Sequence, residues 1–353
     1  MGRCNVPRSR TAVFRAPFVS CVLALVAALA SGGCAQEVDE EPVESAESEL
    51  FEAKPLGPEP SGSPTRYPII LVHGFGGAPG NPFGFKGVAD ALRRDGHTVA
   101  EAALPSFAPP TVRAPILARQ VDALRAKCAE TKSCDGAKVN IIAHSQGGLD
   151  ARHLVSVLGY GDRVASITTV STPHRGTYLA DAAVGLVPGL LDDAVDALGK
   201  LWTRIFTDAD LAGETDVRAA LVALSESASA EFNATHPDDP RVFYQSWAGV
   251  SSILGVPNPK DRDACAGRFE TYRGRRDHMM LALHAATAIV AHGLEMRPND
   301  GMVSVESARW GEFRGCIPAD HADELGGPFD KYSGFDANRF YRNVAFDLQR
   351  RGF

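Results

Sequence analysis

The sequence has no excess of basic residues. Its 353 residues include 36 Lys and Arg against 43 Asp and Glu, which gives a net charge of −7. Residues 1–34 carry +4 and residues 35–62 carry −8, so the rest of the chain carries −3 and has no basic field. Because nucleic-acid binding depends on Lys and Arg that neutralise phosphates, we expect no nucleic-acid partner. The sequence also contains no internal repeat.

The leader lacks a hydrophobic run long enough to stay in a membrane. Residues 18–30 are apolar, but this run is too short for a permanent membrane helix. Four arginines precede it and small residues follow it, which is typical of an export signal over residues 1–34. The small residues before Cys34 resemble a bacterial lipobox, which predicts lipidation of Cys34 and a tether to the outer membrane. Ordinary signal-peptidase cleavage nearby, with release of a secreted protein, is the alternative.

Residues 35–63 lack apolar periodicity and are rich in Glu, Pro and Ser. Such a segment cannot bury enough apolar surface to fold, so we predict a disordered tether there. Because 44% of the residues are hydrophobic, the chain can bury one large core. We place that core in a single domain over residues 64–353.

Cysteine is sparse, and the sequence has no CxxC motif and no neighbouring pair of histidines. Beyond residue 34 four cysteines remain: Cys128, Cys134, Cys265 and Cys316. An even number suits two disulfides in an oxidising compartment, and we predict the pairs Cys128 with Cys134 and Cys265 with Cys316. Metal binding by these cysteines is the alternative, and the missing CxxC motif argues against it.

Strand-like and helix-like segments alternate along residues 64–353. Nearly continuous apolar runs are typical of strands buried on both faces of a parallel sheet, and they cover residues 66–77, 98–104, 138–143, 163–170 and 241–250. Helical patterns cover residues 84–95, 112–129 and 337–351. This alternation predicts an α/β fold with a mostly parallel sheet flanked by helices.

The pattern changes over residues 177–240. A strongly apolar helical stretch follows a predicted strand directly and is interrupted by Pro188 and Gly189. We interpret this segment as a mobile helical cap, or lid, inserted over the functional site. A pair of helices packed into the core is the alternative.

Ser145 ends a strand-like run and is followed at once by a helical pattern. Strand, sharp turn and helix in this order form the setting of a nucleophile elbow. Small residues two positions either side of the serine let the strained turn fit against neighbouring backbone. Here they are Ala143 and Gly147, where glycine is usual at both positions. An ordinary serine in a strand-to-helix turn is the alternative.

A serine hydroxyl becomes an effective nucleophile when a base takes its proton and a carboxylate orients that base. On this fold class the chain order is serine, acid, histidine. We expect the base at His321, in a polar loop late in the chain, and the acid at Asp300, which leads a turn into an apolar segment. The rival carboxylates are Asp277, Asp320, Asp323 and Asp330.

Two backbone N–H groups should bind the oxyanion of a tetrahedral intermediate. We assign them to Gln146, at the start of the helix after the serine, and to Phe75, in the loop after the first strand. We expect His73 and His174 to brace loops. We expect His236 to lie in a surface turn.

Several motifs occur in one order: residues 67–74, residues 139–149, the sequence Thr172-Pro173-His174-Arg175-Gly176, and residues 299–303 followed by His321. Together they resemble the secreted true lipases of the Pseudomonas and Burkholderia type, over residues 66–182 and 296–325. The resemblance implies an α/β-hydrolase with a Ser145, Asp300 and His321 triad and Phe75 and Gln146 as oxyanion donors. It also implies hydrolysis of lipid esters at an oil–water interface, with no cofactor for the chemistry.

The same family carries a structural calcium ion beside the catalytic histidine. Asp323 matches one ligand position and Asp277 matches another, whereas the expected glutamine ligand falls at Gly327. A family cysteine is replaced by Glu306, so a bridge from Cys265 would differ from the family's. Many relatives also need a lipase foldase, which would be a partner of this chain.

These observations lead us to expect a serine carboxylic-ester hydrolase, with triacylglycerol lipase as the first hypothesis. A short-chain esterase or a polyester depolymerase on the same triad is the alternative among enzymes. A non-catalytic hydrolase shell that binds lipid is the alternative among binding proteins. Candidates at all three triad positions argue against that last possibility.

Overall fold

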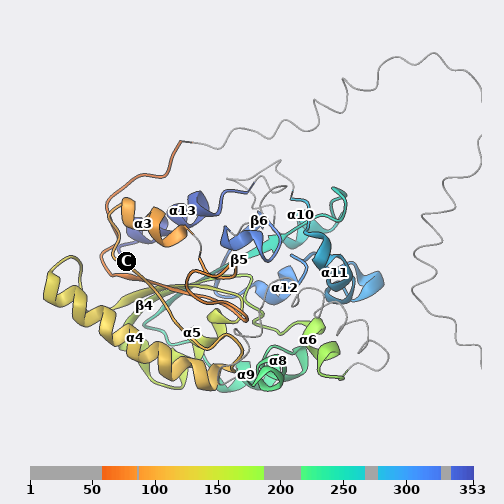
Figure 1. Cartoon of the computed structure of the whole chain (residues 1–353), viewed down its shortest axis with the longest axis horizontal. Helices are drawn as coiled ribbons and strands as arrows, with labels where there is room; N and C mark the ends of the chain where they lie inside the picture. The colour runs from red at the N-terminus through yellow and green to blue at the C-terminus, as the bar shows by residue number, and fades with distance from the viewer. Residues whose placement is uncertain (1–57, 86, 187–215, 267–276, 327–334) are drawn as a thin grey trace, which may run out of the picture. The chain divides into compact units, whose positions relative to one another are not determined.

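The computed structural model describes residues 58–85, 87–186, 216–266, 277–326 and 335–353 (Figure 1). Its centre is a six-stranded parallel sheet in the order β2-β1-β3-β4-β5-β6. The strands are β1 (Ile69–Val72), β2 (Val99–Glu101), β3 (Val139–His144), β4 (Val164–Val170), β5 (Phe243–Val250) and β6 (Glu312–Pro318). Because the strands are parallel, their carboxyl ends meet at one edge, where open α/β sheets hold their sites.

The interior strands match the sequence pattern that predicted them. Every residue of β1, β3 and β4 is buried, as expected for strands covered on both faces. The predicted α/β fold class is therefore confirmed. Strand β6 was not predicted, because it lies at the edge of the sheet and begins with Glu312, Phe313 and Arg314, which are only half-buried. Such a strand produces no continuous apolar run.

Helices cover both faces of the sheet (Figure 1). Helices α3 (Val88–Arg94) and α13 (Ala337–Arg350) cover one face, and α4 (Pro110–Thr131) and α5 (Gly147–Ser156) cover the other. Side chains alternate along β1, so Ile69 and Leu71 pack in the core with α3 and α13. Ile70 and Val72 pack in the core with α4 and α5. The two cores hold the sheet between two helical layers.

Short elements fill the connections between the later strands. They are η1 (Tyr160–Asp162), α6 (Tyr178–Ala183), α8 (Val217–Ala223), α9 (Glu226–Thr235), α10 (Asp261–Ala264), η2 (Leu281–Leu283), α11 (His284–Val290), η3 (Gly293–Glu295), α12 (Val305–Ala308) and η4 (Asp323–Leu325). No helix of the described residues combines the length and the apolar character needed to cross a membrane.

The predicted cap falls partly on residues 187–215, which lie outside the described residues together with Pro188 and Gly189. The described part consists of α6, α8 and α9. The carboxylate of Asp181 on α6 accepts hydrogen bonds from the N–H groups of Glu226, at 2.6 Å, and Ser227, at 3.2 Å, at the start of α9. This contact fastens two helices of the segment together, and its function as a lid stays a prediction.

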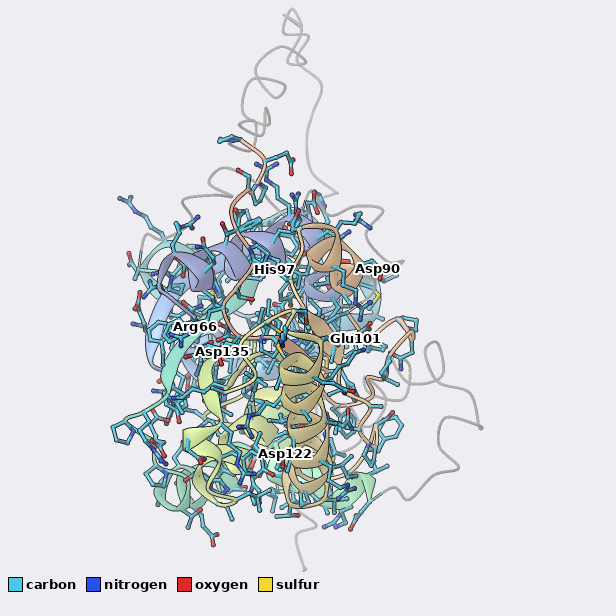
Figure 2. All side chains as sticks on the ribbon, turned by 90° about the vertical axis from the view of Figure 1, so that its left-hand side faces the viewer. Arg66, Asp90, His97, Glu101, Asp122 and Asp135 are labelled. Atoms are coloured by element: carbon cyan, nitrogen blue, oxygen red, sulfur yellow. A yellow bond between two sulfur atoms is a disulfide. The ribbon has the colours of Figure 1, made fainter. Side chains whose placement is uncertain are left out.

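Residues 58–63, which we assigned to the tether, lie against α13. Glu59 forms ion pairs with Arg339 and with Arg342, the latter at 2.7 Å. The chain then continues to Arg66, which pairs with Asp135 at 2.9 Å (Figure 2). Glu59 therefore connects the end of the predicted tether to α13, and the tether itself stays a prediction.

Both predicted disulfides are present in the structure. Cys128, near the end of α4, is bonded to Cys134, and Cys265, next to α10, is bonded to Cys316 of β6. The first bridge closes a loop of a few residues, whereas the second joins segments 51 residues apart. The second therefore restricts the unfolded chain more strongly than the first.

Candidate active site

Ser145 lies in the turn between β3 and α5, at the carboxyl edge of the sheet. Its φ of 54° is in the left-handed region, which costs a non-glycine residue about 1–2 kcal/mol. Two hydrogen bonds hold the strained turn. The Ser145 N–H donates to Val170 O at 2.9 Å, and Thr172 Oγ1 donates to Ser145 O at 2.7 Å. The serine therefore projects from a turn whose backbone is fixed on both sides.

Two glycines allow close packing at this turn: Gly147, which follows the serine, and Gly74, in the loop after β1. A Cβ atom at Gly147 would clash with the carbonyl oxygen of Val72, and one at Gly74 would lie 2.5 Å from the Ser145 Cβ. Ala143, by contrast, is accommodated inside β3 and is fully buried. The extra methyl group relative to the usual elbow pattern therefore fits within the sheet.

Ser145, His321 and Asp300 are brought together in one hydrogen-bonded series. His321 Nε2 lies 3.0 Å from Ser145 Oγ, and His321 Nδ1 lies 2.7 Å from Asp300 Oδ2. The other oxygen of Asp300 accepts from the N–H groups of Met302, at 2.9 Å, and Val303, at 2.7 Å. An ionised carboxylate only accepts, so the hydrogen of a neutral His321 is on Nδ1. Nε2 then presents a lone pair to the serine, as a base must.

The loop that carries His321 is more enclosed than its polar sequence indicated. It follows β6, and residues 319–325 are all buried. The His321 N–H donates to the carbonyl oxygen of Asp300 at 3.0 Å, so the backbones of the two residues are joined as well as their side chains. The relative position of acid and base is therefore fixed by two bonds.

The two residues predicted to supply oxyanion donors lie on either side of the serine in the fold. Gln146 precedes α5, and the first N–H groups of a helix have no acceptor within it. The Gln146 side chain is directed elsewhere, because its Nε2 donates to Ala108 O at 2.7 Å. Phe75 lies in the loop after β1, with its ring edge-on to Phe107 at a centroid distance of 5.1 Å.

A buried arginine, which sequence patterns did not single out, holds the loop after β1. The Arg113 side chain is fully buried and donates to Asp150 Oδ2 on α5 at 2.8 Å. It also donates to three backbone carbonyls, those of His73 at 2.6 Å, Gly74 at 3.2 Å and Pro105 at 3.0 Å. One guanidinium therefore links the loop before Phe75 to the helix after the serine.

His73 braces the same loop. Its Nδ1 lies 3.0 Å from Gly74 O, and its Nε2 accepts from the Leu104 N–H at 3.3 Å. Burial, assisted by the neighbouring Arg113 charge, lowers the pKa of His73 to about 3. A ring that stays neutral and is bonded at both nitrogens supports the loop and is unsuited to act as a base.

Comparison with known proteins identifies the family. A family model described as the alpha/beta hydrolase fold matches residues 67–258. The chain is 30% identical over 314 residues to a triacylglycerol lipase of Vibrio cholerae, and the alignment covers 82% of this chain and 89% of that protein. The chain belongs to the α/β-hydrolase family.

Two further relatives agree with this assignment. The α/β-hydrolase is 29% identical to a triacylglycerol lipase of Pseudomonas fragi, over 74% of this chain and 88% of that protein. The mature form of a Bacillus licheniformis lipase shares its fold with a TM-score of 0.53 at 19% identity, over 79% of this chain and 93% of that chain. The resemblance to bacterial lipases inferred from the sequence motifs is confirmed.

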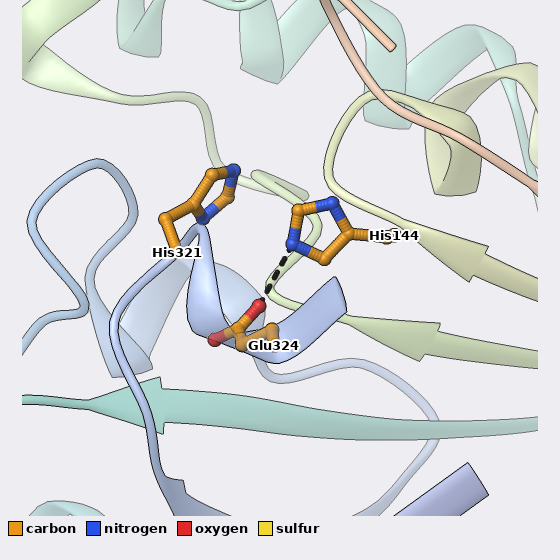
Figure 3. Close-up of side chains that lie close together, drawn as sticks. All are labelled: His144, His321 and Glu324. Atoms are coloured by element: carbon orange, nitrogen blue, oxygen red, sulfur yellow. Dashed lines mark hydrogen bonds and ion pairs between the residues drawn. The ribbon is translucent and has the colours of Figure 1, made fainter. Parts of the chain in front are cut away.

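A second buried group of side chains lies beside the base of this α/β-hydrolase. Glu324 Oε2 lies 2.9 Å from His144 Nε2, and both side chains are close to His321 (Figure 3). Burial, and then the neighbouring Asp300 carboxylate, raise the pKa of Glu324 well above its usual range. Burial lowers the pKa of His144 well below its usual range. Sequence patterns pointed to neither residue.

Three buried aspartates form an oxygen-rich cluster. One carboxylate oxygen from each of Asp277, Asp320 and Asp323 lies within 4.8 Å of the others. Oxygen donors of this kind suit a hard cation such as Ca²⁺, and buried carboxylates this close repel one another without one. Asp320 is also occupied within the protein, because its Oδ2 accepts from the Met280 N–H at 2.8 Å. The three carboxylates together therefore fit a divalent cation.

Among the described rival acids, none is hydrogen-bonded to the His321 ring, whose Nδ1 is bonded to Asp300. Asp320 is instead bonded to backbone N–H groups at the start of its own loop, at 2.9 Å from Ala322 N and 3.0 Å from Asp323 N. Asp330 lies outside the described residues, as does Gly327.

The prediction that His236 lies in a surface turn is wrong. His236 is buried at the end of α9, and its Nε2 lies 2.9 Å from His153 Nδ1 on α5. Arg152 adds a bond to the His236 carbonyl at 3.0 Å. The Pro and Asp residues that follow His236 suggested a turn, but the histidine itself packs between two helices.

Proposed function

We propose that this α/β-hydrolase hydrolyses carboxylic esters of lipids, with triacylglycerols as its substrates, through an acyl-enzyme on Ser145. The observation that carries the proposal is the series of hydrogen bonds from Ser145 through His321 to Asp300, at 3.0 and 2.7 Å. The triacylglycerol lipases among its relatives support the substrate class.

In the first half of the reaction, the Ser145 oxygen attacks the ester carbonyl carbon while His321 Nε2 takes the serine proton. The tetrahedral intermediate collapses with cleavage of the bond to the alcohol oxygen, which receives that proton from His321. In the second half, His321 takes a proton from water, and the resulting hydroxide attacks the acyl-enzyme. The acid leaves, and the proton returns to Ser145. Asp300 stabilises the imidazolium formed in each half.

Negative charge develops on the carbonyl oxygen of each tetrahedral intermediate. We assign its stabilisation to the N–H groups of Phe75 and Gln146, which flank Ser145 in the fold. By analogy with the deletion of such a donor in other hydrolases, each is expected to lower the barrier by about 3 kcal/mol.

The substitution Ser145→Ala tests the proposal. It should abolish turnover of p-nitrophenyl esters and covalent labelling by a fluorophosphonate, while thermal unfolding stays that of a folded domain. Wild-type turnover in this variant would overturn the assignment. Rates over a series of acyl lengths, below and above the solubility limit, test the substrate class. A rate that rises on emulsified triacylglycerol supports a lipase, whereas saturation below the solubility limit supports an esterase.

We further propose that Asp277 and Asp323, together with Asp320, hold a structural Ca²⁺ ion. The support is the mutual proximity of three buried carboxylates. When bound, the ion would neutralise this cluster and stiffen the loop that carries His321, since Asp323 lies two residues beyond the base. It would take no part in the chemistry.

We also propose that the chain is exported, with residues 1–34 as its signal and Cys34 as a lipidated anchor. The disulfides of the folded domain support an oxidising compartment. Metabolic labelling with palmitate tests the anchor, because Cys34→Ser should lose the label and appear in the medium. Whether a lipase foldase assists folding is tested by refolding the denatured chain alone.

A further inference from the structure

A buried carboxyl group joins the segment that carries the nucleophile to the segment that carries the base. Glu324 lies three residues beyond His321 and is fully buried. Its Oε2 atom lies 2.9 Å from His144 Nε2, and its Oε1 atom accepts from Ser171 Oγ at 2.6 Å (Figure 3). His144 directly precedes Ser145, and Ser171 directly follows β4. One carboxyl group therefore ties the loop of the base to the ends of two strands.

The His144 ring makes a second connection between the same two segments. It is hydrogen-bonded to the backbone of His321, and the two rings are 4.5 Å apart between centroids. A displacement of the His321 loop would therefore break the bonds at Glu324 and at His144 together. The separation of the serine and the base depends on this pair of contacts.

The surrounding fold leaves room for this one side chain. A Cβ atom at Gly249 on β5 would clash with Glu324 Oε1. The Gly249 N–H donates to Ser171 Oγ at 2.9 Å, so the third strand end joins the same network. Ser171 itself has a φ of 45°, a conformation that is costly for a non-glycine residue. A strained serine and an obligatory glycine both serve the position of the Glu324 carboxyl group.

Glutamine matches glutamate closely in the size and shape of its side chain. Its amide both donates and accepts hydrogen bonds, so it can bond to His144 Nε2 and accept from Ser171 Oγ as the native side chain does. Alanine can make neither bond.

We propose that Glu324 is a positioning residue, whose hydrogen bonds hold the His321 ring within reach of the Ser145 hydroxyl. The proposal rests on the ester hydrolysis proposed above. Glu324 is bonded to neither the serine hydroxyl nor the His321 ring. It is bonded to His144 and to the Asp300 carboxyl group, so it acts on the ring through these two neighbours and through the backbone of its own loop. Its contribution is geometric and requires no negative charge.

The test compares Glu324→Gln with Glu324→Ala in the full chain. Glutamine keeps both hydrogen bonds, so kcat should stay within about threefold of wild type. Alanine removes both, so kcat should fall by about tenfold to a hundredfold with little change in KM, since a displacement of about 1 Å in a catalytic group costs on this order. The rate of serine labelling by a fluorophosphonate should fall in parallel, because it depends on the same serine and base.

Gln245→Ala serves as the matched control. Gln245 is another buried polar side chain, but it donates to Thr168 Oγ1 inside the sheet and lies outside the network of Glu324. This variant should lose stability without loss of kcat in the folded protein, so a general effect of deleting a buried polar side chain is separated from a positional one. If Glu324→Ala does not fold, Ser171→Ala removes one of the two bonds with a smaller change in volume. It should lower kcat while leaving KM unchanged.

Two outcomes overturn the proposal. Wild-type kcat in Glu324→Ala would show that the bonds are unnecessary. Equal damage in Glu324→Gln and Glu324→Ala would show that the charge, as in a metal ligand or a second acid for His321, is what matters. Neither outcome bears on the ester hydrolysis, which fails only if Ser145→Ala remains active.

Discussion

Removal of the Arg113 guanidinium is the most informative single change outside the reacting residues. The substitution Arg113→Met keeps most of the side-chain volume and deletes every donor. Asp150 then loses its partner at 2.8 Å, and the carbonyl groups of His73, Gly74 and Pro105 lose theirs. The variant therefore has a buried Asp150 without a counter-charge, and the loop after β1 has lost its hydrogen bonds to Arg113.

The cost in stability follows from the burial of Asp150. Burial raises the pKa of Asp150 from 3.8 to about 6 even though Arg113 opposes it. Breaking a buried pair from one side costs about 3–5 kcal/mol, out of a total of about 5–15 kcal/mol for a domain. Without Arg113 the acid takes up a proton near neutral pH, so we expect the lower end, about 3 kcal/mol. For a domain of this size, that lowers Tm by about 6–12 °C.

The double variant Arg113→Met with Asp150→Leu separates stability from catalysis. It leaves no buried charge, and replacement of a buried ion pair by apolar side chains is often neutral or stabilising. We expect Tm to return to the wild-type range while kcat stays reduced. The reason is that the Gly74 carbonyl and the Phe75 N–H belong to one planar peptide. Loss of the Arg113 bond leaves that carbonyl with only the contacts of His73 Nδ1 and the Gly77 N–H, so the proposed oxyanion donor is held less firmly. A donor displaced but not deleted should cost about 10- to 100-fold in kcat.

The stability of the fold should depend on pH through the titration of Asp150. Asp150 has a higher pKa in the folded state than in the unfolded state, so the folded protein binds its proton more tightly. Folding is therefore penalised by about 3 kcal/mol above pH 6, and the penalty disappears as the pH falls toward 4. Wild-type Tm should rise relative to the double variant as the pH is lowered from 7 to 4.5, as measured by calorimetry.

Two measurements could refute this reasoning. A double variant with wild-type kcat would show that the loop holds the oxyanion donor without Arg113. If Arg113→Met unfolds at the wild-type temperature, removal of the guanidinium does not leave Asp150 without a stabilising partner. Arg152→Met is the control, because Arg152 is also buried on α5 but donates to Asn233 and to the His236 carbonyl instead. It should lose stability and keep the kcat of the folded protein.

Three further predictions concern the reacting residues and the fold around them. His321→Ala should lower kcat on p-nitrophenyl esters by more than about 10⁴-fold, since among the described residues only His321 offers a ring nitrogen to the serine hydroxyl, and a loss below tenfold would point to a different base. Gly147→Ala should destabilise the fold by about 1–3 kcal/mol because its Cβ meets the Val72 carbonyl. Gly159→Ala, with φ of 75° and nothing within 4 Å of a new Cβ, is the control and should lose only about 1 kcal/mol. Chelation by EDTA should lower Tm, with recovery on added Ca²⁺, and Asp277→Asn should abolish the response; an unchanged Tm in wild type would rule out the ion.

Much of the fold was predictable from the sequence because parallel strands leave a plain pattern. Interior strands such as β3 are buried on both faces, so they consist of mostly apolar runs, here interrupted by the buried Asn140. Strand β6 was not predictable in the same way, since its exposed edge allows Glu312 and Arg314. The contacts of residues 58–63 could not be predicted either, because the ion pairs of Glu59 with α13 depend on residues almost three hundred positions away.

The residues of the candidate site also differ in whether the sequence could predict them. Ser145, Asp300 and His321, which the structure joins by hydrogen bonds, could be selected from the sequence because the proposed reaction restricts both residue types and their order along the chain. Arg113 and Glu324 were not, because each acts through partners that only the folded chain brings together. Arg113 reads in the sequence as one polar residue of an amphipathic helix, and Glu324 as one acid in a polar loop. A fully buried charge or carboxyl group needs several hydrogen-bond partners to be tolerated. The partners of Arg113 are backbone carbonyl groups of the loop after β1, and a partner of Glu324 is His144, next to Ser145. The burial of a polar side chain beside a reactive one therefore identifies a supporting residue, and burial is known only once the fold is known.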